Sequence, residues 1–144
     1  MYQVGIKRKF VARHYLVGDF GDESRPHEHV YTAEWTCSAE GLDGSGFAVD
    51  ISIMESTLEQ VLKGISGRLL NDLEFFQSWK PGGEPGRQTG CQPSVENVAR
   101  FILTELFSSL ERQRYDTCII SEAEVRIWES ETAWASYRMA LRLP

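Results

Sequence analysis

The histidines are the residues in this sequence whose types and spacing point most directly to chemistry. The chain contains only His14, His27 and His29, and a single residue separates the last two. In an extended strand, residues i and i+2 point to the same side, so His27 and His29 would project together, about 6–7 Å apart. If a strand carrying His14 pairs antiparallel with theirs, three imidazoles converge and a fourth position stays open. That arrangement is typical of a catalytic zinc site, where the ion acts as a Lewis acid and lowers the pKa of what it binds.

The same pattern has a simpler interpretation, because two histidines at the start of a strand can face solvent and bind nothing. The third histidine, one strand earlier in the chain, favours the metal site. Sequence spacing alone leaves both interpretations open.

The elements that must position these histidines follow from the periodicity of the sequence. Residues 4–15 are rich in β-branched and aromatic side chains and predict a strand, with His14 on the same face as Phe10 and Ala12. A loop with glycine, aspartate and proline follows, and residues 30–39 predict a second strand. The two strands would place the histidines at their adjoining ends.

Beyond a glycine-rich turn, residues 47–53 predict a third strand that forms a hairpin with the second. The period changes over residues 55–73, where apolar residues at three- and four-residue steps predict a helix. Ser56 is the expected N-cap of that helix, and Glu59 would complete a capping box. Ser94 is expected to open a second helix.

Residues 80–90 between the helices are rich in glycine and proline, which indicates a mobile or functional loop. Residues 119–129 and 133–143 alternate well enough to predict two closing strands. The resulting order, β-β-β-α-α-β-β, segregates strands from helices. This segregation indicates an α+β fold with helices on one face of an antiparallel sheet.

Length and composition favour an ordinary globular protein. The 144 residues fit a single domain over 1–144, with 42% hydrophobic and 25% charged residues. The net charge of -6 argues against nucleic acid as a partner. We find no apolar run near the roughly 20 residues of a membrane span and no secretory signal. Three widely spaced cysteines indicate a reducing compartment, so we expect a cytoplasmic protein without a membrane partner.

Several blocks of the sequence resemble the 6-pyruvoyl-tetrahydropterin synthase family and its bacterial 6-carboxy-tetrahydropterin synthase branch. The stretch FVARHYL is similar to F-x-A-A-H-x-L, HEHVY to H-G-H-x-Y, and GFAVDISIME to G-M-V-x-D-F-x-x-L-K. The stretches RLLNDL, PSVENVARFI and VRIWESETAWASY resemble further family blocks, in family order. Together they cover nearly the whole chain.

The resemblance implies the T-fold, a four-stranded antiparallel sheet with two helices on one face, which oligomerises into a barrel. Trimers close the barrel, and two trimers usually stack, so the implied assembly is a homohexamer. The implied zinc ligands are His14, His27 and His29. Glu129 corresponds to the glutamate that anchors the pterin ring, since a carboxylate can accept two parallel hydrogen bonds from a 2-amino-pyrimidinone edge.

The sequence departs from the family where catalysis takes place. Glu23 stands at the position of the family's catalytic cysteine, and Ser66 and Gly67 replace its aspartate–histidine pair. This exchange of cysteine for glutamate resembles a variant branch of the family that is linked to folate synthesis. A carboxylate can act as a general base if burial or a neighbouring charge raises its pKa. The alternative is a solvated glutamate in a charged loop. Glu28 replaces a family glycine and is expected to point away from the metal.

The leading functional hypothesis is therefore a zinc-dependent pterin enzyme, a carbon–oxygen or carbon–carbon lyase. Its substrate would be a dihydropterin such as dihydroneopterin or its triphosphate, altered in the C6 side chain. Triphosphate elimination, rearrangement to a 6-carboxy product and aldol-type cleavage all remain open. The alternative is a catalytically inactive homologue that still binds metal and pterin, and a ligand-free oligomer is a third possibility.

Overall fold

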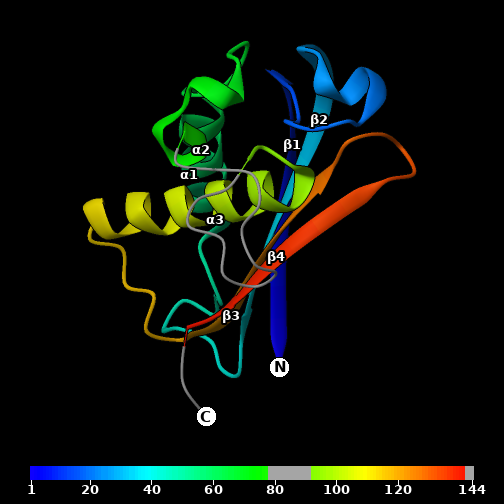
Figure 1. Cartoon of the computed structure of the whole chain (residues 1–144). Helices are drawn as coiled ribbons and strands as arrows, with labels where there is room; N and C mark the ends of the chain where they lie inside the picture. The colour runs from blue at the N-terminus through cyan, green and yellow to red at the C-terminus, as the bar shows by residue number, and fades with distance from the viewer. Residues whose placement is uncertain (78–91, 142–144) are drawn as a thin grey trace.

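One antiparallel sheet forms the framework of the molecule (Figure 1). The computed structural model describes residues 1–77 and 92–141. The strands pair in chain order, which confirms the four-stranded sheet of the T-fold. They are β1 (Tyr2–His14), β2 (His27–Ala39), β3 (Ile120–Trp128) and β4 (Trp134–Ala140).

Helices cover one face of this sheet (Figure 1). The two longer helices are α1 (Ile51–Lys63) and α3 (Val95–Arg112). Three short helical turns are η1 (Gly21–Ser24), η2 (Leu70–Asp72) and α2 (Glu74–Gln77). No helix in the described ranges has both the length and the apolarity needed to cross a membrane.

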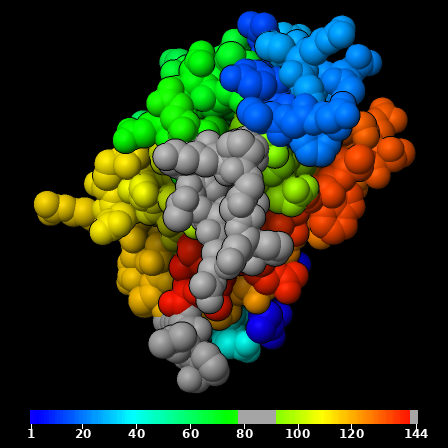
Figure 2. Space-filling model, viewed as in Figure 1, coloured from blue at the N-terminus to red at the C-terminus, as the bar shows by residue number. Residues whose placement is uncertain are grey.

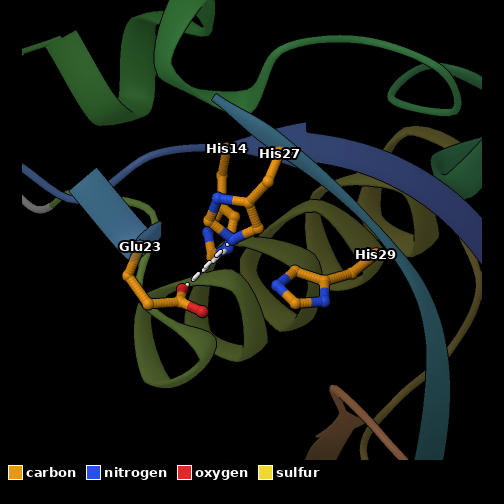
Figure 3. A group of neighbouring side chains, drawn as sticks. All are labelled: His14, Glu23, His27 and His29. Carbon is orange, nitrogen blue, oxygen red and sulfur yellow. Dashed lines mark ion pairs between the residues drawn. The ribbon is translucent and has the colours of Figure 1, made fainter. Parts of the chain in front are cut away.

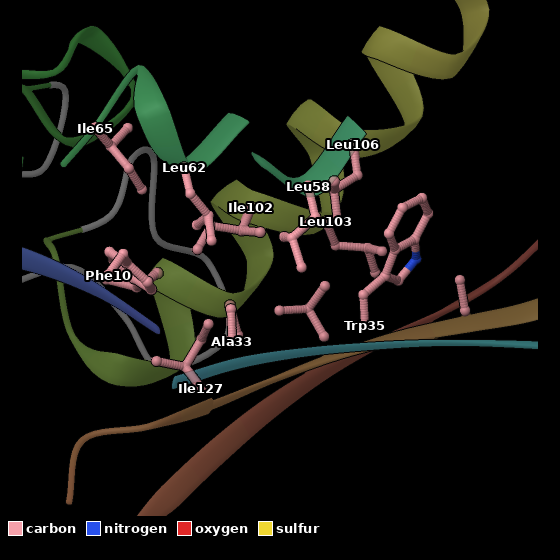
Figure 4. Close-up of a cluster of buried hydrophobic side chains, with 14 of the residues drawn as sticks. Phe10, Ala33, Trp35, Leu58, Leu62, Ile65, Ile102, Leu103, Leu106 and Ile127 are labelled. Carbon is pink, nitrogen blue, oxygen red and sulfur yellow. The ribbon is translucent and has the colours of Figure 1, made fainter. Parts of the chain in front are cut away.

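The hydrophobic core lies between the sheet and the helices (Figure 4). Alternate residues of each strand point into it, as the period of two requires. In β2, for example, Tyr31, Ala33, Trp35 and Cys37 are all fully buried. Apolar residues of the helices meet them from the other side, among them Leu58, Leu62, Ile102, Leu103 and Leu106.

The prediction of a strand over residues 47–53 was wrong. The Asp50 carboxylate accepts a hydrogen bond from the Ser52 N–H at 2.8 Å and caps α1, which begins at Ile51. Within the described residues β2 therefore has no hairpin partner after it in sequence, and it pairs instead with β3 across 80 residues of chain. The alternation that suggested a strand also fits a helix start in so short a stretch.

The predicted helix over residues 55–73 was correct only in its first half. The helix ends at Lys63, where Gly64 takes the C-cap position, and Ser56 is an interior residue rather than an N-cap. The predicted N-cap at Ser94 is confirmed, since its hydroxyl oxygen accepts a hydrogen bond from the Asn97 N–H. The predicted loop over residues 80–90 lies outside the described residues.

The segment after α1 returns to the end of β1 and braces it. The Arg13 N–H donates to the Arg68 carbonyl oxygen at 2.9 Å, and the side-chain amide of Asn71 both accepts from and donates to the backbone of Tyr15. Figure 2 shows this segment, in green, beside the blue β1–β2 connection. These contacts fix the strand end that carries His14.

Candidate metal centre

The three histidines come together at the end of the β1–β2 pair (Figure 3). His14 lies opposite His27 in the strand register, and His29 follows two residues along the same face. Ring centroids are 4.5 Å apart for His14 and His27, 4.7 Å for His27 and His29, and 5.1 Å for His14 and His29. With Glu23, each side chain offers one ligand atom within 4.8 Å of the others.

Backbone carbonyl oxygens fix the orientation of two of the rings. His14 Nδ1 lies 2.6 Å from the Pro93 oxygen, and His27 Nδ1 lies 2.7 Å from the Arg25 oxygen. Because a carbonyl oxygen only accepts, Nδ1 must carry the proton in both rings. The lone pair of each neutral ring then sits on Nε2, the atom that points into the cluster.

The Nε2 atoms are the unsatisfied groups of this site. All three are buried, and none has a hydrogen-bond partner among the described residues. His27 Nε2 lies 3.1 Å from a Glu23 oxygen and His29 Nε2 2.9 Å from a Glu129 oxygen, and these contacts become ion pairs only when the imidazoles are protonated. Converging lone pairs of this kind fit a divalent transition metal.

Burial keeps His14 in the form that binds metal. Its side chain is only 1% exposed. The loss of solvent lowers its pKa, and the neighbouring imidazoles of His27 and His29 lower it further. The Pro93 hydrogen bond and the Glu23 charge act in the opposite direction and are outweighed. His14 is therefore neutral at pH 7.

Glu23 reaches the cluster from η1, with its side chain 43% exposed. Its carboxylate lies 3.8 Å from His14 Nε2 as well as 3.1 Å from His27 Nε2. The Leu16 N–H donates to the Glu23 carbonyl oxygen at 2.7 Å, and the Ser24 hydroxyl donates to the Gly18 oxygen. These hydrogen bonds fix the loop that places the partly exposed Glu23 carboxylate beside the histidines.

Glu129 approaches the same cluster from the residue after β3. Its carboxylate contacts His29 at 2.9 Å, and its N–H donates to the Ala133 oxygen in the β3–β4 turn. Glu28, by contrast, pairs in register with Arg13 and is exposed on the opposite face of the sheet. The structure thus gathers the predicted site residues His14, Glu23, His27, His29 and Glu129.

Ser66 and Gly67, which replace the family's aspartate–histidine pair, make hydrogen bonds to backbone carbonyl oxygens. The Ser66 hydroxyl donates to the Leu62 oxygen, and the Gly67 N–H donates to the Val11 oxygen at 2.7 Å. Gly67 has a φ of 75°, a left-handed conformation that glycine adopts without strain. No titratable side chain at these two positions faces the histidines.

Two further residues at the site were missed by the sequence analysis. Tyr31 continues the alternation of His27 and His29, so the period of two in β2 could have revealed it. Its ring makes an edge contact with that of His29 at a centroid distance of 5.3 Å. Burial raises the pKa of the Tyr31 phenol, and the charges of Glu129 and Glu23 raise it further. The second missed residue, Pro93, acts through its carbonyl oxygen, which no sequence signal marks.

Comparison with known proteins places the chain in a family. The model of the 6-pyruvoyl tetrahydropterin synthase family matches residues 3–140. The chain belongs to this family. A 6-carboxy-5,6,7,8-tetrahydropterin synthase of Bacillus subtilis (strain 168) is 29% identical over 115 residues, which cover 80% of this chain and 69% of that protein.

Solved structures of the family share the fold. The 6-pyruvoyl tetrahydropterin synthase of Caenorhabditis elegans is 22% identical with a TM-score of 0.70, and covers 97% of this chain and 98% of its own. The Plasmodium falciparum enzyme gives a TM-score of 0.74 at 15% identity over the same shares. A Plasmodium vivax 6-pyruvoyltetrahydropterin synthase, described as a catalytic residue mutant with glutamate changed to cysteine, also gives 0.74, at 14% identity and the same coverage.

Proposed function

We propose that this protein is a zinc-dependent enzyme that acts on the C6 side chain of a dihydropterin, such as dihydroneopterin or its triphosphate. The observation that carries the proposal is the convergence of three unsatisfied Nε2 atoms beside two carboxylates. Family membership supports a pterin as the substrate.

His14, His27 and His29 would hold the metal through Nε2. Zinc so held would supply Lewis-acid polarisation of a side-chain oxygen on the substrate. The protein fixes the ring orientations in advance through the Pro93 and Arg25 carbonyl oxygens. Such outer contacts keep the ligand tautomers and directions correct.

Glu23 would act as the general base in place of the family cysteine. Its carboxylate lies 3.8 Å from His14 Nε2 and 3.1 Å from His27 Nε2, so it stands beside the atoms that would hold the metal. The carboxylate would accept a proton from a carbon of the substrate side chain, and positioned proton transfer contributes about 10²–10⁴-fold to a rate. The changed glutamate of the Plasmodium vivax enzyme, described as a catalytic residue, supports this role.

Glu129 would bind the ring of the pterin. Its carboxylate offers two acceptor oxygens to the amino and amide N–H groups of the ring. In this structure the same carboxylate contacts His29 Nε2 at 2.9 Å, so ring binding requires it to turn away from that nitrogen. Metal binding at His29 Nε2 would also require the Glu129 carboxylate to move away. Metal binding and ring binding therefore require the same movement of Glu129 and are compatible.

Assembly into a homohexamer of two trimers is part of the proposal. The sheet ends in β1 on one side and β4 on the other, and in the described part of the chain each pairs with only one strand. Open edges invite pairing between copies, and closure removes them. Light scattering should give about six chain masses, and a monomer would contradict this assembly.

The decisive experiment combines metal analysis with product identification. The purified protein should contain about one zinc per chain and convert dihydroneopterin triphosphate or dihydroneopterin to a new pterin detected by mass spectrometry. Glu23→Gln should keep its zinc and lose at least about 10²-fold in rate. Loss of zinc from this variant would make Glu23 a ligand instead of a base.

The remaining outcomes separate the alternatives. Tight pterin binding with no new product would indicate an inactive homologue that retains its sites. Absence of both metal and pterin binding would contradict the proposal and leave a structural role.

A further inference from the structure

The Tyr31 hydroxyl is a buried polar group that the proposed mechanism has not used. Tyr31 is 0% exposed, and its oxygen has no hydrogen-bond partner in the ranges 1–77 and 92–141. A hydroxyl buried in this way has given up its hydrogen bonds to water, which costs free energy. A ligand bound beside such a group could supply the missing hydrogen-bond partner.

Three aromatic rings pack around the buried Tyr31 side chain. The Phe10 ring stacks on it at a centroid distance of 5.1 Å and an interplanar angle of 20°. The rings of His29 and His14 contact it edge-on at 5.3 and 6.1 Å. Burial raises the pKa of the Tyr31 phenol, and the charges of Glu129 and Glu23 raise it further, so the hydroxyl keeps its proton.

A second buried group shows why location matters. Trp35 Nε1 is also a buried polar group, but it lies in the hydrophobic core, where its ring packs against Phe107 and its side chain is a hydrogen-bond partner of the Cys37 thiol. Tyr31 differs because its ring touches two of the metal-site histidines. Of these two residues, only Tyr31 packs against the histidines at which a ligand would bind.

We propose that Tyr31 contacts the substrate directly and donates a hydrogen bond to an oxygen of the C6 side chain. The inference rests on the proposed function and adds a residue to it. The C6 side chain of the substrate, rather than its pterin ring, is the expected acceptor of this hydrogen bond. The contacts with His14 and His29 place Tyr31 at the metal end of the site. A neutral phenol beside two carboxylates is suited to donate to a neutral hydroxyl or carbonyl oxygen.

The test compares two ligands that differ only in the side chain. Neopterin carries an oxygen-bearing C6 side chain, whereas pterin carries hydrogen at C6. Dissociation constants for the zinc-loaded protein are measured from the quenching of pterin fluorescence. Tyr31→Phe should weaken neopterin binding about tenfold and leave pterin binding unchanged, while Glu129→Gln should weaken both.

Stability separates ligand contact from a structural role. Tyr31→Phe removes an unsatisfied oxygen without changing the ring, so its melting temperature and zinc content should equal or exceed those of the unaltered protein. Tyr115→Phe is the matched control, because Tyr115 accepts a hydrogen bond from the Asp50 N–H at 3.0 Å far from the histidines in sequence. That variant should lose stability and keep its affinity for neopterin.

Each remaining outcome decides against a specific claim. Equal effects of Tyr31→Phe on both ligands, or no effect on either, would overturn the side-chain contact. Failure of the unaltered, zinc-loaded protein to bind either ligand would overturn the proposed function, and the role of Tyr31 with it.

Discussion

The two faces of the sheet hold their polar groups in opposite ways. On the open face, Glu124 accepts hydrogen bonds from Arg126 at 3.2 Å and from Arg138 at 3.1 Å, and the Arg126 guanidinium lies 3.8 Å over the Trp134 ring. On the helix-covered face, the Nε2 atoms of the three histidines are buried without hydrogen-bond partners in the described chain. Polar groups on the two faces of one sheet therefore meet opposite conditions.

This difference in hydrogen bonding distinguishes ordinary surface charges from a ligand-binding site. Charges on the open face are satisfied by neighbours and by water, so each pair adds little to stability. Lone pairs on the covered face have lost water and gained no donor, so their burial is favourable only with a bound cation or substrate. Unsatisfied buried groups therefore locate function better than clusters of charge do.

The largest effect should come from removing one ligand nitrogen. His29→Ala should reduce the zinc content from about one per chain to near zero, because two imidazoles no longer form a complete site. Metal analysis of the purified variant measures this. Glu28→Ala is the matched control, one residue away on the opposite face, and should keep its metal. Full zinc in the His29 variant would refute the ligand set.

A smaller effect should follow from loosening the end of β1. Asn71→Ala removes both hydrogen bonds to the Tyr15 backbone and frees the residue next to His14. Metal affinity, measured by competition with a chelator, should fall about tenfold, as for other supporting contacts. Gln113→Ala removes hydrogen bonds to Thr57 and Ser109 and should leave the affinity unchanged. Equal metal affinities in the unaltered protein and the two variants would exclude a positioning role for Asn71.

Acid should release the metal gradually. Because burial lowers the pKa of His14, the unfolded chain binds a proton at this residue at a higher pH than the folded chain does. Its contribution to folding is therefore present above about pH 6.5 and falls as the pH drops below that value. Protons also compete with metal for all three rings. Dialysis at decreasing pH with metal analysis measures the release, and full retention at about pH 5 would argue for different ligands.

The smallest effect is expected on the open face. Arg138→Ala breaks its ion pairs with Glu122 and Glu124, in which the Arg138 side chain is 63% exposed. The free energy of unfolding should change by less than about 1 kcal/mol, with the metal content unaltered. Urea denaturation measures the change. A loss of metal in this variant would mean that the two faces are coupled, and would weaken the contrast between them.

Local patterns predicted most of the elements. Alternation over long stretches identified the four strands of the sheet, and the Ser94 cap identified the start of α3. The pattern failed over residues 47–53 because seven residues can alternate in a strand or begin a helix. The Asp50 cap decided for the helix, and the true neighbour of β2 came from the far end of the chain.

The sequence by itself determined which groups could do chemistry at this site. The metal hypothesis follows from the three histidines. The pterin hypothesis follows from the family motifs and from the glutamate at the family's cysteine position. Strand periodicity also predicted that His27 and His29 share a face, and the same period extends to Tyr31, which the sequence analysis did not single out. All of these follow from residue type and local spacing.

Only the tertiary structure decided how these groups are satisfied. The contact of His14 with the Pro93 oxygen, and that of His29 with Glu129, join segments separated by 79 and 100 residues. The solitary hydroxyl of Tyr31 depends on the absence of any partner within reach, in the part of the chain described. Burial and hydrogen bonding between distant segments are properties of packing, and local sequence does not encode them.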